Sequence, residues 1–336
     1  MFAYIVRRVF SGFVMLLAMT LVTMALFFSG PVNPARVMCG KNCTPELIAQ
    51  TKKALGYDKP VLVQWRDFAV GLVAGRHYPD DKALAKTHPE MIADCPAPCI
   101  GYSTISTQTV ASAVGRAFPV TASLAFAAFI MWMVFGVGMG ITAALFKGRL
   151  VDRGIVGFSL IFYAFPTFAI GLTFAIIAIR VFGYSPAYQS IADSGVGGWL
   201  QGLFLPSLTL ALVYIAGYVR LTRAFVIETT SEDYLRTAKA KGLRPSRILA
   251  KHTMRAALTP IVTAAGLDLG GLLGGAIITE TVFNYNGLGK LAVMSTQTYD
   301  LPIIVGIVLL AASFIITANI VVDILYAFID PRVKYT

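Results

Sequence analysis

The sequence predicts an all-α polytopic membrane protein with six transmembrane helices and an external subdomain between the first two. Of the 336 residues, 57% are hydrophobic and 13% are charged, whereas roughly 25% of residues in a soluble domain are charged. Six apolar windows reach the length of about 20 residues that a helix needs to cross a bilayer. Basic residues cluster in the segments that separate them.

The six windows have few or no charged residues. Four contain no Asp, Glu, Lys or Arg; they lie between Arg8 and Arg36, Arg116 and Lys147, Arg153 and Arg180, and Asp193 and Arg220. The fifth, residues 256–283, contains Asp268 and Glu280, and the sixth runs from 301 to about 328 with Asp323 near its end. Residues 16–28 and 168–179 are apolar on every face, which indicates helices, because barrel strands alternate apolar and polar residues.

The first window follows Arg7 and Arg8, as the apolar part of a signal peptide would. Its apolar run is too long for a signal peptide, and no small-residue cleavage site closes it. We therefore expect residues 1–30 to form a cytoplasmic N-terminus and a retained first span.

The net charge of +11 comes from basic residues whose positions along the chain indicate the membrane topology. More than half of the 28 Lys and Arg residues lie in segments 7–8, 147–153, 220–255 and 332–334, which fall on one side of a six-span arrangement. Short loops rich in Lys and Arg stay cytoplasmic, so both termini are predicted on the cytoplasmic side of the bacterial cytoplasmic membrane. The basic excess is therefore a topology signal, and we expect membrane lipid but no nucleic acid as a partner.

Residues 31–116 are too long for a turn and predict the external subdomain. A helix is expected at 44–56, where Thr44 can cap it, Pro45 takes its first position and Gly56 ends it. A second helix near the membrane surface is expected from Trp65. Residues 76–98 are polar and interrupted by prolines, as in a solvated insertion.

All four cysteines lie in this external loop, as the pairs CGKNC and CPAPC formed by Cys39, Cys43, Cys95 and Cys99. An even number of cysteines in an oxidising compartment favours disulfides, with three possible connectivities. The alternative is a metal site with four thiolate ligands. A link between the two pairs would close the longer loop and stabilise more.

No catalytic constellation is present. The sequence has no G-x-x-x-x-G-K-[ST] phosphate loop, since NYNGLGKL lacks the spacing and the final Ser or Thr. Its three histidines are His77 and His88 in the outer insertion and His252 in an inner loop. We therefore expect no enzyme activity, no resident metal and no cofactor in this chain.

The inner loop 220–257 predicts a short helix of about three turns across the cytoplasmic end. Ser231 is expected to cap it, with Glu232 and Asp233 in its first turn, where the helix dipole favours acids. Gly242 would stop it, and Pro245 would redirect the chain. Ala238 and Ala240 would leave room for another surface, although a solvated basic connector explains the composition equally well.

The residues of this loop also carry a family resemblance. DYLRTAKAKGL, continuing through His252 and Ala257 to Pro260, resembles the coupling-loop signature of binding-protein-dependent permeases, in its dipeptide and oligopeptide form. Four further segments are similar to the B-type permease subunit of such importers: YIVRRVF, LIAQTKKALGYDKPVLVQW, ETVFNYNGLGKL and IDPRVKY. Only the insertion at 76–98, with CPAPC, departs from the family pattern.

The resemblance implies a type I ABC importer permease fold, with a five-helix permease core at 117–336. It further implies a heterodimer with a sibling permease, two ABC ATPase subunits that bind ATP and Mg, an external substrate-binding protein, and a peptide substrate. It assigns contact with the ATPase to one segment: Asp233, Tyr234, Arg236, Thr237, Ala238, Lys239, Ala240, Lys241 and Gly242.

Several residues within the apolar windows are candidates for a role in the translocation pathway or in helix packing. Gly266, Gly270 and Gly274, spaced by four, favour close helix packing, at the sibling interface or within the chain's own bundle. Asp268 is either a pathway residue or a packing residue, because a carboxylate at that depth needs water, a partner or a proton. Glu280 and Asp323 favour structural roles. Pro166 and Pro206 are expected to break or start spans, as ordinary kinks in preference to hinges.

The main competing function is an ATP-independent secondary transporter. Against it, the sequence has no inverted repeat and few intramembrane charges. Within the resembled family, nickel, haem or other cargo remains an alternative to peptides.

Overall fold

The structure is a computed structural model that describes residues 2–29, 35–36, 44–79 and 92–329. Five of the described helical segments are long and apolar enough to cross a membrane, and one bent pair makes a sixth candidate. The predicted class of all-α polytopic membrane protein is therefore confirmed. The six candidates are α1 (Phe2–Ser29), α6 with the π-helical η2 and α7 (Val110–Trp132, Met133–Val137, Gly138–Leu145), the pair α8 and α9 (Leu150–Ala164, Thr167–Phe182), α10 (Ile191–Thr230), α12 with the π-helical η3 and α13 (Pro245–Arg247, Ile248–Thr253, Met254–Leu273), and α16 (Leu301–Ile329).

The chain forms two compact units. The first comprises Met1–Pro119 and Asn286–Ile316, and the second comprises Val120–Tyr285 and Thr317–Thr336. Helices α6 and α16 each contribute residues to both units.

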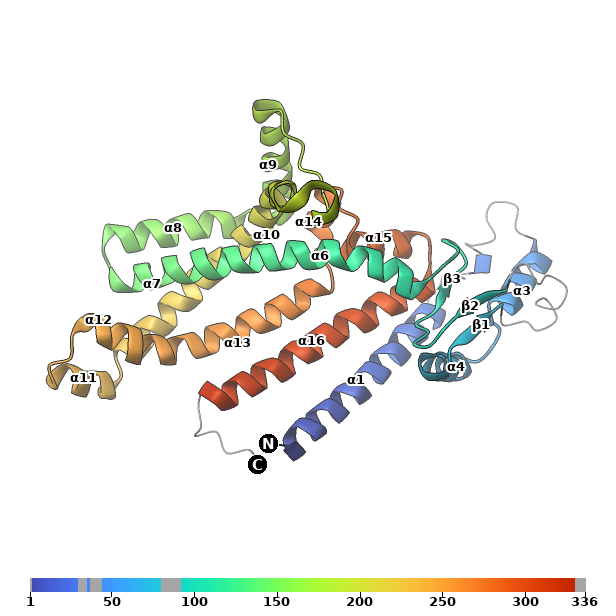
Figure 1. Ribbon diagram of the computed structural model, residues 1–336, viewed down its shortest axis with the longest axis horizontal. Coiled ribbons are helices and arrows are strands. Elements are labelled where there is room, and N and C mark those ends of the chain that lie inside the picture. Colours follow the sequence, from blue (N-terminus) through green and yellow to red (C-terminus); the bar gives the residue numbers. More distant parts are fainter. Residues whose placement is uncertain (1, 30–34, 37–43, 80–91, 330–336) are drawn as a thin grey trace. The chain divides into compact units, whose positions relative to one another are not determined.

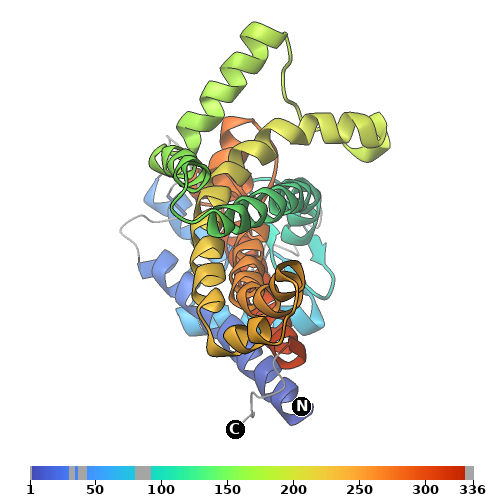
Figure 2. The same ribbon diagram turned by 90° about the vertical axis from the view of Figure 1, so that its left-hand side faces the viewer.

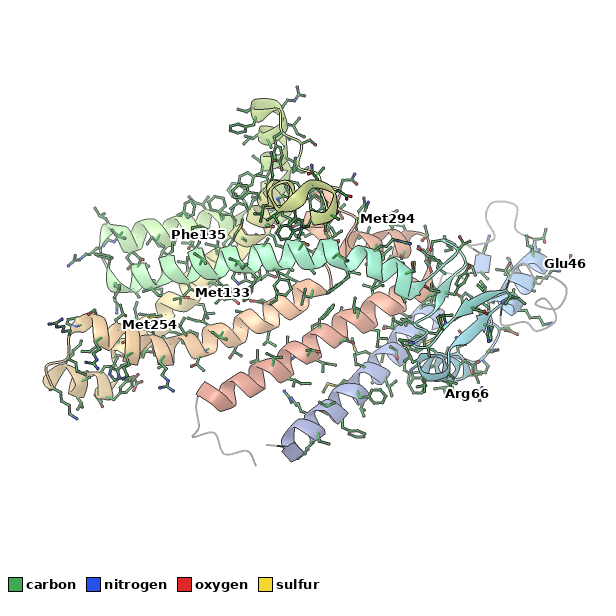
Figure 3. The ribbon with its side chains drawn as sticks, viewed as in Figure 1. Glu46, Arg66, Met133, Phe135, Met254 and Met294 are labelled. Carbon is green, nitrogen blue, oxygen red and sulfur yellow. A yellow bond between two sulfur atoms is a disulfide. The ribbon has the colours of Figure 1, made fainter. Side chains whose placement is uncertain are left out.

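In the first unit, α3 (Pro45–Ala54) has the ends that the sequence predicts. The Thr44 side chain accepts a hydrogen bond from the backbone N–H of Leu47 (3.3 Å), Pro45 is the first helical residue, and Gly56 follows with φ 70°. Capping oxygens of this kind satisfy one of the N–H groups that a helix start leaves unpaired. Glu46 marks this helix in Figure 3.

Helix α4 (Val61–Ala74) begins four residues before the predicted start at Trp65. Trp65 anchors it to α1, because the indole N–H donates to the Leu17 carbonyl (3.2 Å) and to the Thr20 hydroxyl (3.1 Å). Phe68 of α4 is buried in a cluster with Met24 of α1. Arg66 marks α4 in Figure 3.

A small hairpin follows α4. Strands β1 (Arg76–Tyr78) and β2 (Ala93–Cys95) pair antiparallel, with Arg76 opposite Cys95. The second hairpin joins β3 (Tyr102–Ser103) to β4 (Gln108–Thr109). The backbone N–H of Cys99 donates to the Gly71 carbonyl (3.2 Å), which ties the base of the insertion to α4.

Asp300 ties the second hairpin to the start of α16. It follows α15 (Leu288–Gln297), is 3% exposed, and accepts a hydrogen bond from the Ser103 hydroxyl. Burial raises the pKa of this carboxyl, against the hydrogen bonds from Ser103 and from the backbone of Ile303. The hairpin is therefore held by a buried polar contact in addition to its two-residue strands.

The second unit is organised around α10. Its core includes Trp132, Leu203 and Ile261, all at most 1% exposed. Gly136 in η2 and Gly140 in α7 allow close approach, because a Cβ on either would lie within 3 Å of a side chain of α10. Small residues let helices approach in this way where lipid supplies no hydrophobic driving force.

Two of the predicted windows are broken rather than continuous. The third is divided at Phe165 and Pro166, where α8 and α9 diverge by 96°. Figures 1 and 2 show α9 turning away from α8. The prediction that Pro166 breaks a span is confirmed, and the bend is sharper than an ordinary kink: proline lacks the N–H and disfavours helical backbone at the residue before it, so the helix ends there. Pro206 lies inside α10 without ending it.

The fifth window is likewise two helices, α13 and α14 (Ile277–Val282). The chain leaves helical geometry after Gly274, and Gly275 has φ 134°. Only glycine adopts such backbone at little cost, so the glycine pair breaks the span.

Candidate functional site

The candidate coupling helix is α11 (Asp233–Ala240), which is short and amphipathic. It lies with α12 at one end of α10 and α13 (Figure 1). Glu232, not the predicted Ser231, occupies the N-cap position. Ser231 instead ends α10, where its hydroxyl donates to the Glu228 carbonyl (2.6 Å). The helix is thus eight residues long, shorter than the three turns expected.

The end of α11 is closed as the sequence predicts at Gly242, which has φ 74°. Its N–H donates to the Lys239 carbonyl (3.0 Å), and the N–H of Leu243 donates to the Ala238 carbonyl (3.3 Å). This pair of bonds is a Schellman motif, in which a left-handed residue satisfies the last carbonyls of a helix.

One face of α11 packs against its own chain. Leu235, Ala238 and Ile248 form a buried cluster, with Leu243 against it. Ala238 is 8% exposed, so the expectation that it leaves room for another surface is wrong for this residue. Spacing of three places Leu235 and Ala238 on the same helix face, and η3 carries Ile248 to that face.

The opposite face of α11 is open. Tyr234 is 47% exposed, and Arg236, Thr237, Lys239, Ala240 and Lys241 are all exposed. Arg236 approaches Asp233 at 3.4 Å, with both side chains largely in solvent. Burial, and then the charge of Glu232, raise the pKa of Tyr234. This face offers a phenol, an alanine and several cations to whatever contacts it.

A partly buried ion pair joins α8 to α10. Arg223 of α10 donates from Nε to Oδ1 of Asp152 (2.6 Å) and from Nη2 to Oδ2 (2.8 Å). Asp152 is 3% exposed and also accepts from the backbone N–H of Gly148 (2.8 Å). Bidentate pairs between an arginine and a carboxylate are strong and geometrically specific. Neither residue was predicted as a site residue from the sequence; the available signal was Asp152, the one acid in the basic segment 147–153.

Asp268 lies on α13 and accepts a hydrogen bond from the Tyr218 hydroxyl of α10 (2.6 Å, to Oδ2). Its side chain is half-buried. The α13 helix itself begins at Met254, labelled in Figure 3, where η3 ends. The carboxylate therefore has a partner fifty residues away in sequence.

Glu280 is fully buried at the start of α14. Its Oε1 accepts from the Thr121 hydroxyl (2.8 Å) and from the backbone N–H of Ala276 (3.1 Å). These contacts hold the break between α13 and α14 against α6, which is a structural arrangement. The side chain of Asp323 lies outside the described residues.

The three glycines have different surroundings. A Cβ on Gly266 would lie 2.5 Å from Cγ2 of Val322, so this position approaches the chain's own α16. Gly270 is buried, and Gly274 ends α13. Contact with a sibling subunit remains a prediction.

Among the described cysteines, Cys95 and Cys99 form a disulfide, with Cα atoms 5.4 Å apart. This pairing closes the short CPAPC loop and not the longer one considered above. Cys39 and Cys43 lie outside the described residues. Within the described part of the chain, no cluster of His, Cys, Asp and Glu is suited to hold a metal ion.

Comparison with known proteins places these features in a family. Residues 136–335 match the family described as "Binding-protein-dependent transport system inner membrane component". Residues 1–125 match the corresponding N-terminal family, "Binding-prot-dependent transport system membrane comp, N-term". The two matches cover both units.

Curated relatives align along the whole chain. A probable peptide ABC transporter permease of Sinorhizobium fredii is 33% identical, over 99% of this chain and 99% of its own. The di/tripeptide transport system permease of Pseudomonas aeruginosa is 31% identical, over 100% and 99%. The glutathione transport system permease of Escherichia coli is 32% identical, over 100% of both. The chain therefore belongs to the family of binding-protein-dependent transport system inner membrane components, which are multi-pass membrane subunits of ABC transporters.

Proposed function

We propose that this chain is the transmembrane subunit of an ATP-driven peptide importer and forms the translocation pathway with a sibling permease. The observation that carries the proposal is α11, a short helix with one face packed on its own chain and the other open. Its partners would be two ABC ATPase subunits, which bind ATP and Mg, and an external substrate-binding protein. The names of the aligned relatives support peptides as cargo.

In this proposal α11 transmits the ATPase movement. The chain has no phosphate loop of its own, so the free energy of hydrolysis must reach it through a contact. Residues 233–242 are suited to that contact because the packed face fixes the helix on η3 and leaves Tyr234, Lys239 and Ala240 outward. A rigidly held helix transmits displacement better than a solvated connector.

The test is uptake into proteoliposomes that contain the complete transporter and an internal supply of ATP. A labelled tripeptide delivered by the binding protein is expected to accumulate inside. Accumulation should stop when the ATPase subunits carry a hydrolysis-blocking substitution. Uptake that persists without the ATPase subunits would support a secondary transporter, and uptake of nickel or haem in place of peptides would overturn the proposed cargo.

We further propose that both termini and residues 220–257 face the cytoplasm and that residues 31–116 face outward. The basic segments support this orientation. In a cysteine-free background, Asp58→Cys is expected to react with a membrane-impermeant maleimide on intact cells, and Ser246→Cys only after lysis. Both positions are exposed, so accessibility differs only by side of the membrane. The reverse labelling pattern would refute the orientation.

A further inference from the structure

Asp268 lies among aromatic rings of two other helices. The Trp132 ring of α6 stacks on Tyr214 of α10, with centroids 4.4 Å apart and planes at 21°. The Tyr218 ring, whose hydroxyl donates to Asp268, has its centroid 6.1 Å from that of Trp132. Tyr214 and Tyr218 are one turn apart, so both rings lie on the same face of α10. A carboxylate and three aromatic rings are thus grouped within one unit.

Asp268 has few polar contacts within the described part of the chain. The buried Trp132 indole N–H interacts with the Tyr218 hydroxyl and not with the carboxylate. The Asp268 carboxylate receives the Tyr218 bond on Oδ2, and no other hydrogen bond to it occurs among the described residues. A carboxyl group at membrane depth needs a partner, water or a proton, and Tyr218 supplies a single hydrogen bond to this one.

Open space borders the group. A Cβ on Gly271, one turn after Asp268 on α13, would meet no atom within 4 Å. Leu267 is 38% exposed. The carboxylate is therefore approachable from one side, unlike Glu280, which is fully buried and bonded to two donors.

The chemistry of this group suits an organic cation. A carboxylate oxygen accepts N–H donors, and the face of a tyrosine ring attracts ammonium groups. Trp132 and Tyr218 are buried, so Tyr214, which is partly exposed, is the ring available to a ligand. A divalent metal would find one carboxylate here and no His or Cys ligand within the described residues. A peptide with a free N-terminus has an ammonium group at neutral pH, because the α-amino pKa is about 7.7 to 8.0.

We propose that Asp268, with Tyr214 and Tyr218, forms a binding site in the translocation pathway for the N-terminal ammonium group of a peptide in transit. We call this site the station. This rests on the proposed function as a peptide permease. It differs from a packing role for Asp268, because packing would affect stability without any preference for the charge of the cargo.

The test is photo-crosslinking of the purified complete transporter without its binding protein, so that selection by that protein plays no part. The probe is a photoleucine-alanine amide with a free amino group, and the comparison probe is its N-acetylated form. We expect the free-amine probe to label the α10 and α13 segments at least about tenfold more, a ratio that corresponds to about 1.4 kcal/mol. Equal labelling by the two probes would overturn the station.

Variants assign the preference to the carboxylate. Asp268→Asn should bring the labelling ratio close to one, whereas Asp268→Glu should retain it. Glu228→Gln is the matched control, since it removes an exposed carboxylate near the end of α10, and it should leave the ratio unchanged. A ratio that survives Asp268→Asn would contradict the proposal.

The pH dependence of labelling tests the proposal on the unmodified transporter, so the test does not depend on whether Asp268→Asn assembles. Labelling by the free-amine probe should decline above about pH 8, as the amino group loses its proton, while labelling by the acetylated probe stays constant. Parallel curves would refute the station. Peptide uptake in proteoliposomes is scored separately: active uptake with no amine preference defeats the station alone, and absent peptide uptake defeats the proposed function.

Discussion

Tryptophan in place of Gly242 is expected to leave membrane insertion intact and to abolish substrate-stimulated ATP hydrolysis. Gly242 has φ 74° and closes α11, so any other residue strains the turn by about 1 kcal/mol. A side chain at this position would not clash with the rest of the chain, because no atom lies within 4 Å of a Cβ placed on Gly242. If α11 is the proposed coupling helix, the indole would instead occupy the space beside it where the ATPase would bind. The measurement is hydrolysis by the complete transporter with and without loaded binding protein.

Gly148 supplies a matched control for this experiment. It also has a positive φ, 80°, and nothing within 4 Å of a Cβ, but it lies in the turn between α7 and α8. Gly148→Trp carries similar backbone strain and should retain stimulated hydrolysis. If both variants, or neither, lose stimulation, α11 has no special part in coupling.

Loss of Arg223 is expected to destabilise the second unit by about 1 to 3 kcal/mol, less than the about 3 to 5 kcal/mol for a fully buried pair, because the Arg223 side chain is 30% exposed. In Arg223→Met, the Asp152 carboxylate keeps its bond from Gly148 but loses both bonds from the guanidinium. The measurement is the yield and the thermal unfolding temperature of the purified transporter. A variant as stable as the parent would show that the pair contributes little.

A second substitution distinguishes an uncompensated charge from lost packing. Asp152→Asn added to Arg223→Met removes the buried charge and keeps an acceptor for Gly148, so most of the stability should return. Arg236→Met breaks the exposed pair with Asp233, whose side chains are 76% and 93% exposed, and should cost at most about 1 kcal/mol.

Features set by neighbouring residues along the chain were predictable from the sequence. The start of α3 at Thr44 and Pro45 and the end of α11 at Gly242 depend on local backbone chemistry. The six apolar windows depend only on composition over about 20 residues. These features follow from rules that operate within a few turns of helix.

Features set by distant partners were not predictable in the same way. Ser231 and Glu232 can each cap a helix, and the choice depends on where α10 ends. The orientation of Ala238 depends on Ile248, which a π-helical segment places opposite it. The partners of Asp152 and Asp268 are 71 and 50 residues away. No local rule selects among the many donors at such separations.

The break at Pro166 has a consequence for what must cover this part of the chain. Helices α8 and α9 contain 15 and 16 residues, and each falls short of the about 20 that a bilayer crossing requires. Neither helix is therefore long enough to cross a bilayer alone. Helix α9 exposes Leu172, Ile176 and Phe182, and apolar side chains of this size are stable only against lipid or against another apolar protein surface.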